Sequence, residues 1–321
     1  MHLFAFIMGK PHPIRARVEV LGVRLGFALI PLMPRSMVVL LAHITGRGVY
    51  VCSNRNRQVG LANLDVALGE TRTVREKKHI LRRSMQHFIL SLLDLFWFTR
   101  DQENRLNRYL IHAPGYEHVY DPGARLVVTA HIGNWELMGI QAALTGIPIM
   151  SVAAPLKNPM VDTYFNKARM NTGQIIIPQS GAIRKLLHGL REGNTVAVLL
   201  DQNTRPRDGG VFIRMFGLLV PISTAPAAIA IKTNSEIMLA YSRPDGKGMY
   251  HCTSLGTIEI HPDDDPTSLT ERMTQRYEAA ILAYPEMWLW SYKRWKLMPE
   301  GETKPPYPYY ARPLRENDLK R

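Results

Sequence analysis

The 321-residue sequence has little cysteine, a shortage of acidic side chains and none of several common catalytic motifs. Only Cys52 and Cys252 are present, far apart and without metal-ligand spacing, which argues against a disulfide framework and favours a reducing compartment. It has no Gly-x-Ser-x-Gly elbow, no HExxH, no Walker loop and no Gly-x-Gly-x-x-Gly. A serine hydrolase, a zinc protease and a nucleotide-driven enzyme therefore each lose their main support.

The chain has 40 Lys and Arg residues but only 27 Asp and Glu residues, which gives it a net charge of +13. Such a charge points to an anionic partner, which could be nucleic acid, a membrane surface or a phosphorylated substrate. Residues 1–60 hold eight basic side chains and one acid, Glu19, among many Leu, Val, Phe and Met residues. A membrane-facing segment needs both basic and apolar residues, so we expect an anionic membrane surface as partner and no nucleic acid.

The N-terminus does not resemble a cleaved signal, because the apolar residues 1–8 are followed at once by Lys10-Pro11-His12-Pro13. Residues 18–45 are apolar on balance but are interrupted by Arg24, Pro31, Pro34 and Arg35. This pattern favours two helices broken at residues 31–34, lying on the membrane or on the protein, over one spanning anchor.

Residues 14–100 have helical periodicity, with Asn54 and Thr73 as expected N-caps. Beyond residue 110, short β-branched runs alternate with helical stretches, which predicts an α/β fold with a mostly parallel central sheet flanked by helices. The expected strands are 125–130, 148–152, 174–178, 195–200 and 236–241, with one or two more in 249–260. The expected helices between and after them are 134–145, 159–171, 180–191, 222–233 and 267–283. We divide the chain into a helical membrane-associated region (1–109), an α/β core (110–299) and an irregular tail (300–321).

The most informative segment for chemistry follows the apolar run 126–130, which ends just before His131. This run is the first expected strand, so His131 would lie at the carboxyl edge of the sheet, where ligands of open α/β sheets bind. Gly133 would let a substrate approach the backbone. Asn134, which we also expect to bind substrate, would cap a helix whose free N–H groups stabilise developing negative charge. Glu136, in the first turn, could reach back to the imidazole and fix its tautomer. An imidazole held in this way suits acyl transfer to a hydroxyl without a covalent enzyme intermediate.

The segment His131-Ile-Gly-Asn-Trp-Glu136 resembles the HxxxxE form of the motif of lysophospholipid-type acyltransferases. The chain is most similar to the lipid A late acyltransferases, which add lauroyl or myristoyl groups, and to their phosphatidylinositol mannoside acyltransferase relatives. The resemblance continues in Asn63-Leu64, Lys157-Asn158, Phe165-Asn-Lys-Ala-Arg169, Leu200-Asp201-Gln202, Met215-Phe216-Gly217 and the run from Trp288 to Trp295. The glycerol-phosphate branch differs, because it has Asp where Glu136 stands and a Pro-Glu-Gly-Thr-Arg block where this chain has Asp201-Gln202-Asn203-Thr204-Arg205.

This resemblance implies a His base paired with an acid and a thioester of acyl carrier protein or coenzyme A as donor. It also implies a glycolipid acceptor at the cytoplasmic face of the inner membrane, and we expect no cofactor and no metal. Arg169 stands where the family has an arginine facing the site, and it could bind a phosphate or anchor Glu136. Asp201 and Gln202 follow another strand and could orient groups or bind the acceptor, and Lys157 could hold a substrate phosphate. Solvated surface charges or a turn are the alternative explanations for these residues.

We therefore expect an acyltransferase with His131 as base, Glu136 as its partner and an acyl tunnel running from His131 between the sheet and the N-terminal helices. The rival interpretations are an acyltransferase for another membrane lipid, such as a phosphatidylinositol mannoside or an aminolipid, and a non-catalytic lipid-binding or scaffold protein. A nucleic-acid-binding module is the third, although no reading motif is present.

Overall fold

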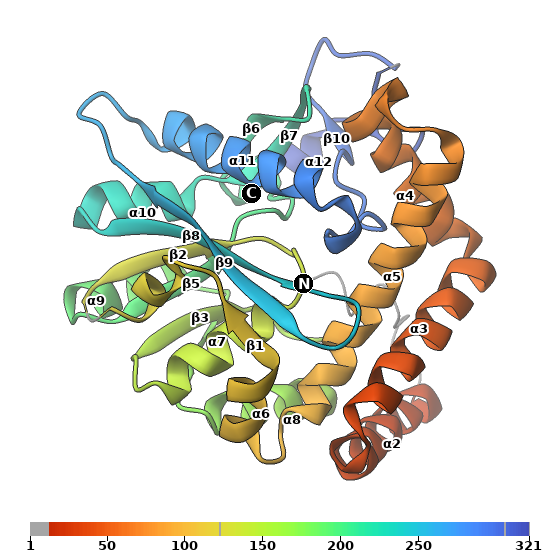
Figure 1. Ribbon diagram of the computed structural model, residues 1–321. Coiled ribbons are helices and arrows are strands. Elements are labelled where there is room, and N and C mark those ends of the chain that lie inside the picture. Colours follow the sequence, from red (N-terminus) through yellow and green to blue (C-terminus); the bar gives the residue numbers. More distant parts are fainter. Residues whose placement is uncertain (1–12, 122, 305, 321) are drawn as a thin grey trace.

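The computed structural model describes residues 13–121, 123–304 and 306–320, so the apolar residues 1–8 lie outside the described part. The described part begins with a layer of helices, which covers one side of the molecule in Figure 1. These helices are α2 (Pro13–Leu29), α3 (Arg35–Cys52), α4 (Asn54–Leu68) and α5 (Val74–Trp97), and the shorter α6 (Gln102–Tyr109) follows outside this layer. The short 3-10 turn Ile30–Leu32 separates α2 from α3, which confirms the break predicted at the prolines.

Two predicted helix caps have different outcomes. Thr73 accepts a hydrogen bond from the Glu76 N–H while the Glu76 side chain accepts from the Thr73 N–H, so α5 starts with a complete capping box. The Asn54 prediction is wrong by one residue, because Ser53 is the N-cap position and α4 already begins at Asn54. The Asn54 side chain instead accepts a hydrogen bond from Arg57.

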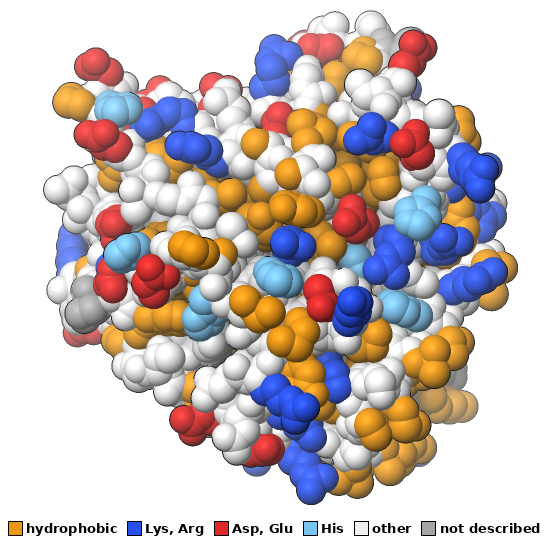
Figure 2. Space-filling model, viewed as in Figure 1, with side chains coloured by type: hydrophobic (Ala, Val, Ile, Leu, Met, Phe, Trp, Pro, Cys, Tyr) orange, Lys and Arg blue, Asp and Glu red, His pale blue; other side chains and the backbone are white. Residues whose placement is uncertain are grey.

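The N-terminal helices expose apolar side chains over much of their length. On α2 the exposed residues recur every three or four positions, which places them on one helix face. The exposed apolar residues of α2 and α3 are Ile14, Val18, Leu21, Leu25, Leu29, Met37, Leu40, Ile44 and Val51. Figure 2 shows hydrophobic side chains gathered at the lower right, where α2 and α3 lie in Figure 1, with basic side chains above them.

No single described helix is long and apolar enough to cross a membrane, although the bent pair of residues 35–52 and 54–71 passes that test as a pair.

The central sheet has seven strands in the order β1-β9-β8-β2-β5-β3-β4. Neighbouring strands of this described sheet run parallel except β8 and β9, which confirms the predicted α/β class. The strands are β1 (Leu110–His112), β2 (Arg125–Thr129), β3 (Ile149–Ala153), β4 (Ile175–Pro178), β5 (Thr195–Leu199), β8 (Glu236–Pro244) and β9 (Tyr250–Ile258). β1 was not predicted, and neither was the separate hairpin of β6 (Gly210–Met215) and β7 (Leu218–Ser223).

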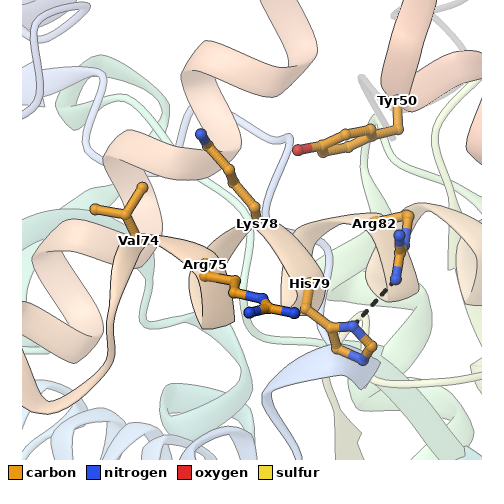
Figure 3. Close-up of a pocket in the computed structure, with 6 residues that line it drawn as sticks. All are labelled: Tyr50, Val74, Arg75, Lys78, His79 and Arg82. Carbon is orange, nitrogen blue, oxygen red and sulfur yellow. Dashed lines mark hydrogen bonds between the residues drawn. The ribbon is translucent and has the colours of Figure 1, made fainter.

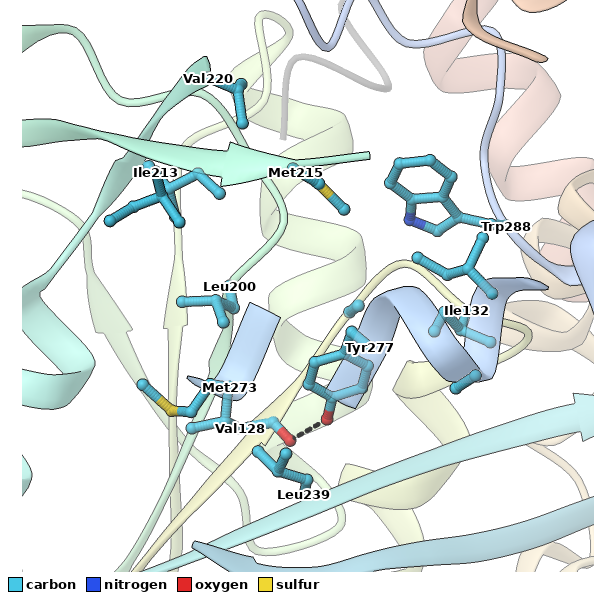
Figure 4. Close-up of a cluster of buried hydrophobic side chains, with 14 of the residues drawn as sticks. Val128, Ile132, Leu200, Ile213, Met215, Val220, Leu239, Met273, Tyr277 and Trp288 are labelled. Carbon is cyan, nitrogen blue, oxygen red and sulfur yellow. Dashed lines mark hydrogen bonds between the residues drawn. The ribbon is translucent and has the colours of Figure 1, made fainter. Parts of the chain in front are cut away.

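Helices cover both faces of the sheet. Successive side chains of the buried strand β2 point to opposite faces, so this strand contributes to a core on each side. Leu126 and Val128 face a large core that includes residues of α9, α10 and α11, part of which is shown in Figure 4. Val127 faces the opposite core, which includes residues of α5, α6 and α7. The helices of the α/β region are α7 (Trp135–Leu144), α8 (Pro159–Met170), α9 (Ala182–Arg191), α10 (Ala225–Thr233) and α11 (Pro266–Ala283). Each of these helices lies within a segment predicted as helical, allowing one residue at the start of α11.

The C-terminal tail is more ordered than the expected irregular segment. It contains β11 (Arg312–Pro313), paired with β10 (Leu297–Met298), and the short helix α12 (Glu316–Leu319). The buried Asp318 carboxylate accepts two hydrogen bonds from the Arg312 guanidinium and one from the Arg315 N–H. These charge-assisted bonds fold the tail back on itself, and pattern analysis did not anticipate them.

A buried ion pair joins the helical layer to the sheet. Arg35 at the start of α3 donates to both carboxylate oxygens of Asp94 on α5. Asp94 Oδ2 also accepts from the Tyr250 hydroxyl of β9 and, at 3.3 Å, from the amide of Asn134. The guanidinium lies over the Trp97 ring at 4.8 Å. Burial alone would lower the pKa of Arg35, but the facing carboxylate raises it above its ordinary value.

Replacing Asp94 by Ala should destabilise the fold by about 3–5 kcal/mol, because it leaves the Arg35 guanidinium buried without its counter-charge. The measurement is the midpoint of urea unfolding followed by circular dichroism. Glu316→Ala removes an exposed carboxylate that pairs with Lys320 and serves as the control. Equal midpoints for the two variants would show that the buried pair does not hold the layers together.

Candidate active site

His131 lies immediately beyond β2, at the carboxyl edge of the sheet, with its side chain only 5% exposed. Its Nδ1 donates to Asp201 Oδ1 at 2.7 Å, and its backbone N–H donates to the other carboxylate oxygen at 3.1 Å. Nε2 lies 3.1 Å from the amide nitrogen of Gln202. The edge of the Trp135 ring packs against the imidazole, with centroids 4.5 Å apart. With its proton on Nδ1, the ring presents a basic lone pair at Nε2.

Asp201 is the partner of the imidazole because of the sheet register. β2 and β5 are parallel neighbours with Thr129 opposite Leu199, so the residues two positions further on meet at the same edge. The carboxylate is buried and also accepts from the Trp288 indole at 2.8 Å and from Arg294 at 3.2 Å. Burial would raise the pKa of Asp201, but the charges of His131 and Arg294 hold it well below its usual range. Asp201 is therefore ionised at any working pH and can only accept hydrogen bonds.

The structure corrects the expected pairing of His131 with Glu136. The Glu136 carboxylate accepts two hydrogen bonds from the Arg169 guanidinium, at 2.6 and 2.8 Å, while Nδ1 of the imidazole is bonded to Asp201. Burial would raise the pKa of Glu136, but the charge and hydrogen bonds of Arg169 lower it on balance. The charge of His131 also lowers this pKa, so Glu136 lies near the ring without fixing its tautomer. Of the two roles suggested for Arg169, the geometry gives it the anchoring one.

Gly133 and Asn134 are both held in place by contacts with neighbouring elements. Gly133 has φ +62°, and a Cβ there would lie 1.6 Å from the Ser242 carbonyl oxygen, so β8 requires the glycine. The N–H groups of Gly133 and Asn134 donate to the carbonyls of Met287 and Ser242. These two N–H groups are therefore not free, but the donors expected to stabilise negative charge are the first-turn N–H groups of α7, and that expectation stays a prediction. Asn134 does cap α7, accepting from the Leu137 N–H at 3.4 Å.

The buried Asn134 side chain is not open to a substrate, because its amide donates to Asp94 and Tyr250 at 3.3 Å each. We therefore assign it a positioning role in place of the expected substrate contact. Lys157 lies exposed in the segment between β3 and α8. The contact of Trp288 and Arg294 with Asp201 was not predicted from the sequence, although both residues stand in the segment that carries the family resemblance. Their shared contact with Asp201 depends on tertiary structure that no local pattern encodes.

Two cavities of the described residues have volumes of about 590 and 210 Å3, and His131 lines neither. The expected acyl tunnel is therefore not one of these cavities. The smaller cavity is lined in part by Phe27 of α2 and Tyr164 of α8, which also border an apolar cluster between α2, α5 and α8.

Among the described residues, no three His, Cys, Asp or Glu side chains are grouped in a way that could hold a metal ion. In the segment His261–Asp265, Asp264 pairs with Arg272 and Asp265 caps α11.

A model of the bacterial lipid A biosynthesis acyltransferase family matches residues 11–297, which is most of the chain. The chain belongs to this family. The acyltransferase is 23% identical to the lipid A biosynthesis lauroyltransferase of Escherichia coli, over 85% of this chain and 90% of the relative. It is 25% identical to the phosphatidylinositol mannoside acyltransferase of Mycolicibacterium smegmatis, over 88% and 93% of the two chains. It is also 25% identical to the lipid A biosynthesis palmitoleoyltransferase of Escherichia coli, over 56% and 58%. These findings confirm the predicted resemblance and show that the protein is an acyltransferase.

The pairing of Glu136 with Arg169 makes the stability of the acyltransferase depend on pH. The folded-state pKa of Glu136 is lowered, so its contribution is present above the unfolded pKa of about 4.3 and is lost as pH falls below it. Glu136→Gln should therefore lower the free energy of unfolding by about 1–3 kcal/mol near pH 7. The difference in this free energy between variant and native protein should narrow towards about pH 3. Urea unfolding at several pH values measures this difference.

A gap that stays constant across this range would contradict the assignment of an ionised, paired Glu136. The double variant Glu136→Gln with Arg169→Met is the control for the pair, and it should lose less stability than the sum of the two single variants.

Proposed function

We propose that this acyltransferase moves a fatty acyl chain from a thioester to a hydroxyl of a glycolipid such as a lipid A precursor, with His131 as general base. The observation that carries the proposal is the hydrogen bond from His131 Nδ1 to the buried Asp201 carboxylate. This bond leaves Nε2 as the proton acceptor, and the negative charge of Asp201 stabilises the imidazolium that forms. Asp201 thus takes the part that we expected of Glu136.

In the proposed reaction, Nε2 of His131 removes the proton of the acceptor hydroxyl as its oxygen attacks the thioester carbonyl. A C–O bond forms, the carbonyl oxygen becomes an oxyanion, and the C–S bond then breaks. The imidazolium returns the proton to the departing thiolate, so the products are an ester and a thiol, with no covalent enzyme intermediate. The Gln202 amide lies at Nε2 and can donate a hydrogen bond to the reacting oxygens.

The Glu136–Arg169 pair is proposed to hold the wall of the site next to the imidazole. A bidentate arginine fixes the carboxylate in one orientation, and the two side chains join the start of α7 to the last turn of α8. This fixed pair holds the Glu136 carboxylate beside the site without competing for Nδ1 of His131.

The nature of the acceptor and donor rests on the relatives. A lauroyltransferase and a palmitoleoyltransferase of lipid A biosynthesis favour a lipid A precursor, and a phosphatidylinositol mannoside acyltransferase makes that glycolipid the second candidate. Both types of acceptor are membrane glycolipids with free hydroxyls. The donor is proposed to be a thioester of acyl carrier protein or of coenzyme A, because the reaction needs a thiol leaving group.

We propose that the exposed apolar face of α2 and α3 rests on the cytoplasmic face of the inner membrane. Leu21 is 57% exposed and Ile44 is 62% exposed, although a water-facing helix normally turns such residues inward. Basic residues such as Arg17 and Arg47 lie on the same helices, and this combination suits an anionic bilayer surface. The face would hold the site beside a lipid acceptor.

Replacing His131 by Ala should lower turnover on the order of 10²–10⁴-fold, because the general base is lost. The assay incubates the purified full chain with acyl thioesters of coenzyme A or acyl carrier protein and with either acceptor glycolipid, and reads product mass. His188→Ala, at an exposed position of α9, is the control and should keep full activity. Turnover of the His131 variant close to that of the control would overturn the proposal.

The same assay tests which carboxylate assists the base. Asp201→Asn should reduce turnover on the order of 100-fold or more, because an amide donor at this position favours the wrong imidazole tautomer. Glu136→Gln should reduce turnover less, since its carboxylate does not bond Nδ1. A larger loss for Glu136→Gln than for Asp201→Asn would return the partner role to Glu136.

A further inference from the structure

The larger cavity, of about 590 Å3, lies on the N-terminal helical layer and has a cationic lining. Tyr50 of α3 faces it from one side, as Figure 3 shows, and the first turns of α5 supply its other residues. The lining consists of Tyr50, Val74, Arg75, Lys78, His79 and Arg82. None of these six side chains is acidic.

Helical spacing forces the cations of this pocket together. Positions 75, 78, 79 and 82 are three or four residues apart, so their side chains share one face of α5. Like charges at this spacing destabilise a helix unless a counter-ion is present. Glu76, the acidic residue of the first turn, is held in the capping box by Thr73. The pocket therefore concentrates positive charge that a bound anion would relieve.

The pocket residues have groups suited to phosphate. Arg82 Nη2 lies 3.1 Å from His79 Nδ1, a contact that orients the guanidinium beside the pocket (Figure 3). Arg75 and Arg82 offer forked donors that match phosphate oxygens, and Lys78 offers a mobile ammonium. The Tyr50 hydroxyl, which points towards the α5 side chains in Figure 3, can add a neutral donor.

The position of the pocket favours a lipid phosphate over the reacting substrate. Tyr50 lies on α3 next to exposed Val51, so the pocket borders the proposed membrane face. Ser91 of α5 bonds the carbonyl of Gly133 near the reaction centre, and it is nine residues beyond Arg82. At 1.5 Å per residue this separation is roughly 14 Å along the helix, so the pocket is distinct from the His131 site.

We propose that this pocket binds the phosphate of an anionic phospholipid headgroup in the bilayer on which the enzyme rests. The inference depends on the membrane-resting surface of the proposed function. An apolar face alone leaves a protein free to rotate on a membrane. A phosphate clamp at the border of that face would fix α5, and with it the edge of the sheet, relative to the bilayer.

The test measures co-sedimentation of the purified full chain with vesicles of phosphatidylcholine, with and without phosphatidylglycerol. The pocket variant combines Arg75→Gln, Lys78→Gln and Arg82→Gln, and single Lys78→Gln is a milder form. The matched control combines Arg184→Gln, Lys185→Gln and Arg191→Gln, which removes equal charge from exposed positions of α9. α9 lies on the opposite side of the molecule from α3 (Figure 1). Circular dichroism confirms that each variant is folded.

We expect the pocket variant to lose the phosphatidylglycerol-dependent part of its binding on the order of 10- to 100-fold, while the α9 control binds like the native protein. Binding to pure phosphatidylcholine, which reports the apolar face, should stay unchanged in both. If the native protein does not bind phosphatidylcholine vesicles, the proposed apolar membrane face is wrong. The pocket is still tested in that case, because the difference in binding between vesicles with and without phosphatidylglycerol reports on it.

An equal loss in the two triple variants would overturn the proposal in favour of unspecific charge attraction. Undiminished phosphatidylglycerol binding by the pocket variant would overturn it as well. A third arm titrates coenzyme A, a soluble phosphate carrier. If the pocket variant loses affinity for coenzyme A and keeps its vesicle binding, the pocket serves the donor and not the membrane.

Discussion

The buried carboxylate of Asp201 is the group on which the arrangement of the site depends. It accepts hydrogen bonds from the backbone and ring of His131, from the Trp288 indole and from Arg294, so one side chain joins the end of β2 to the C-terminal segment. Such a carboxylate is stable in a dry interior only because both of its oxygens face donors or a positive charge. The same contacts that satisfy Asp201 also fix the orientation of the His131 imidazole.

The fold class could be predicted because its signals are local. Apolar β-branched runs alternate with helical segments, and the prolines at 31 and 34 end one helix and start the next. The β6–β7 hairpin was missed because its turn contains Phe216, a non-glycine residue at φ +48°, which gives no standard turn signal. Order in the tail was missed for a different reason. It depends on the ion pair between Arg312 and Asp318, and residue pattern does not show which surface charges will meet.

The structure brings five of the predicted candidate residues together, but not in the predicted pairing. His131, Glu136, Arg169, Asp201 and Gln202 do meet at one sheet edge, because the carboxyl ends of parallel strands share that edge. The motif spacing suggested Glu136 as the partner of His131, since five residues along the chain is a short reach. The true neighbour is 70 residues away and follows β5, which lies beside β2 only because β3 and β4 are placed further out in the sheet. Strand order is a tertiary property, and a single sequence does not contain it in readable form.

The helical layer and the site are linked mechanically as well as by position. Asn134 caps α7 directly after the His131 loop, and its amide bonds Asp94, which is held by Arg35 at the start of α3. α3 carries part of the exposed apolar face, so the helix proposed to rest on lipid is connected through three buried side chains to the turn that carries His131, the proposed base. The three side chains are Arg35, Asp94 and Asn134, and each is bonded to the next. Because all three are buried polar groups, removing any one of them deprives its neighbour of a partner, so the proposed membrane-facing helix and the His131 turn depend on the same set of hydrogen bonds.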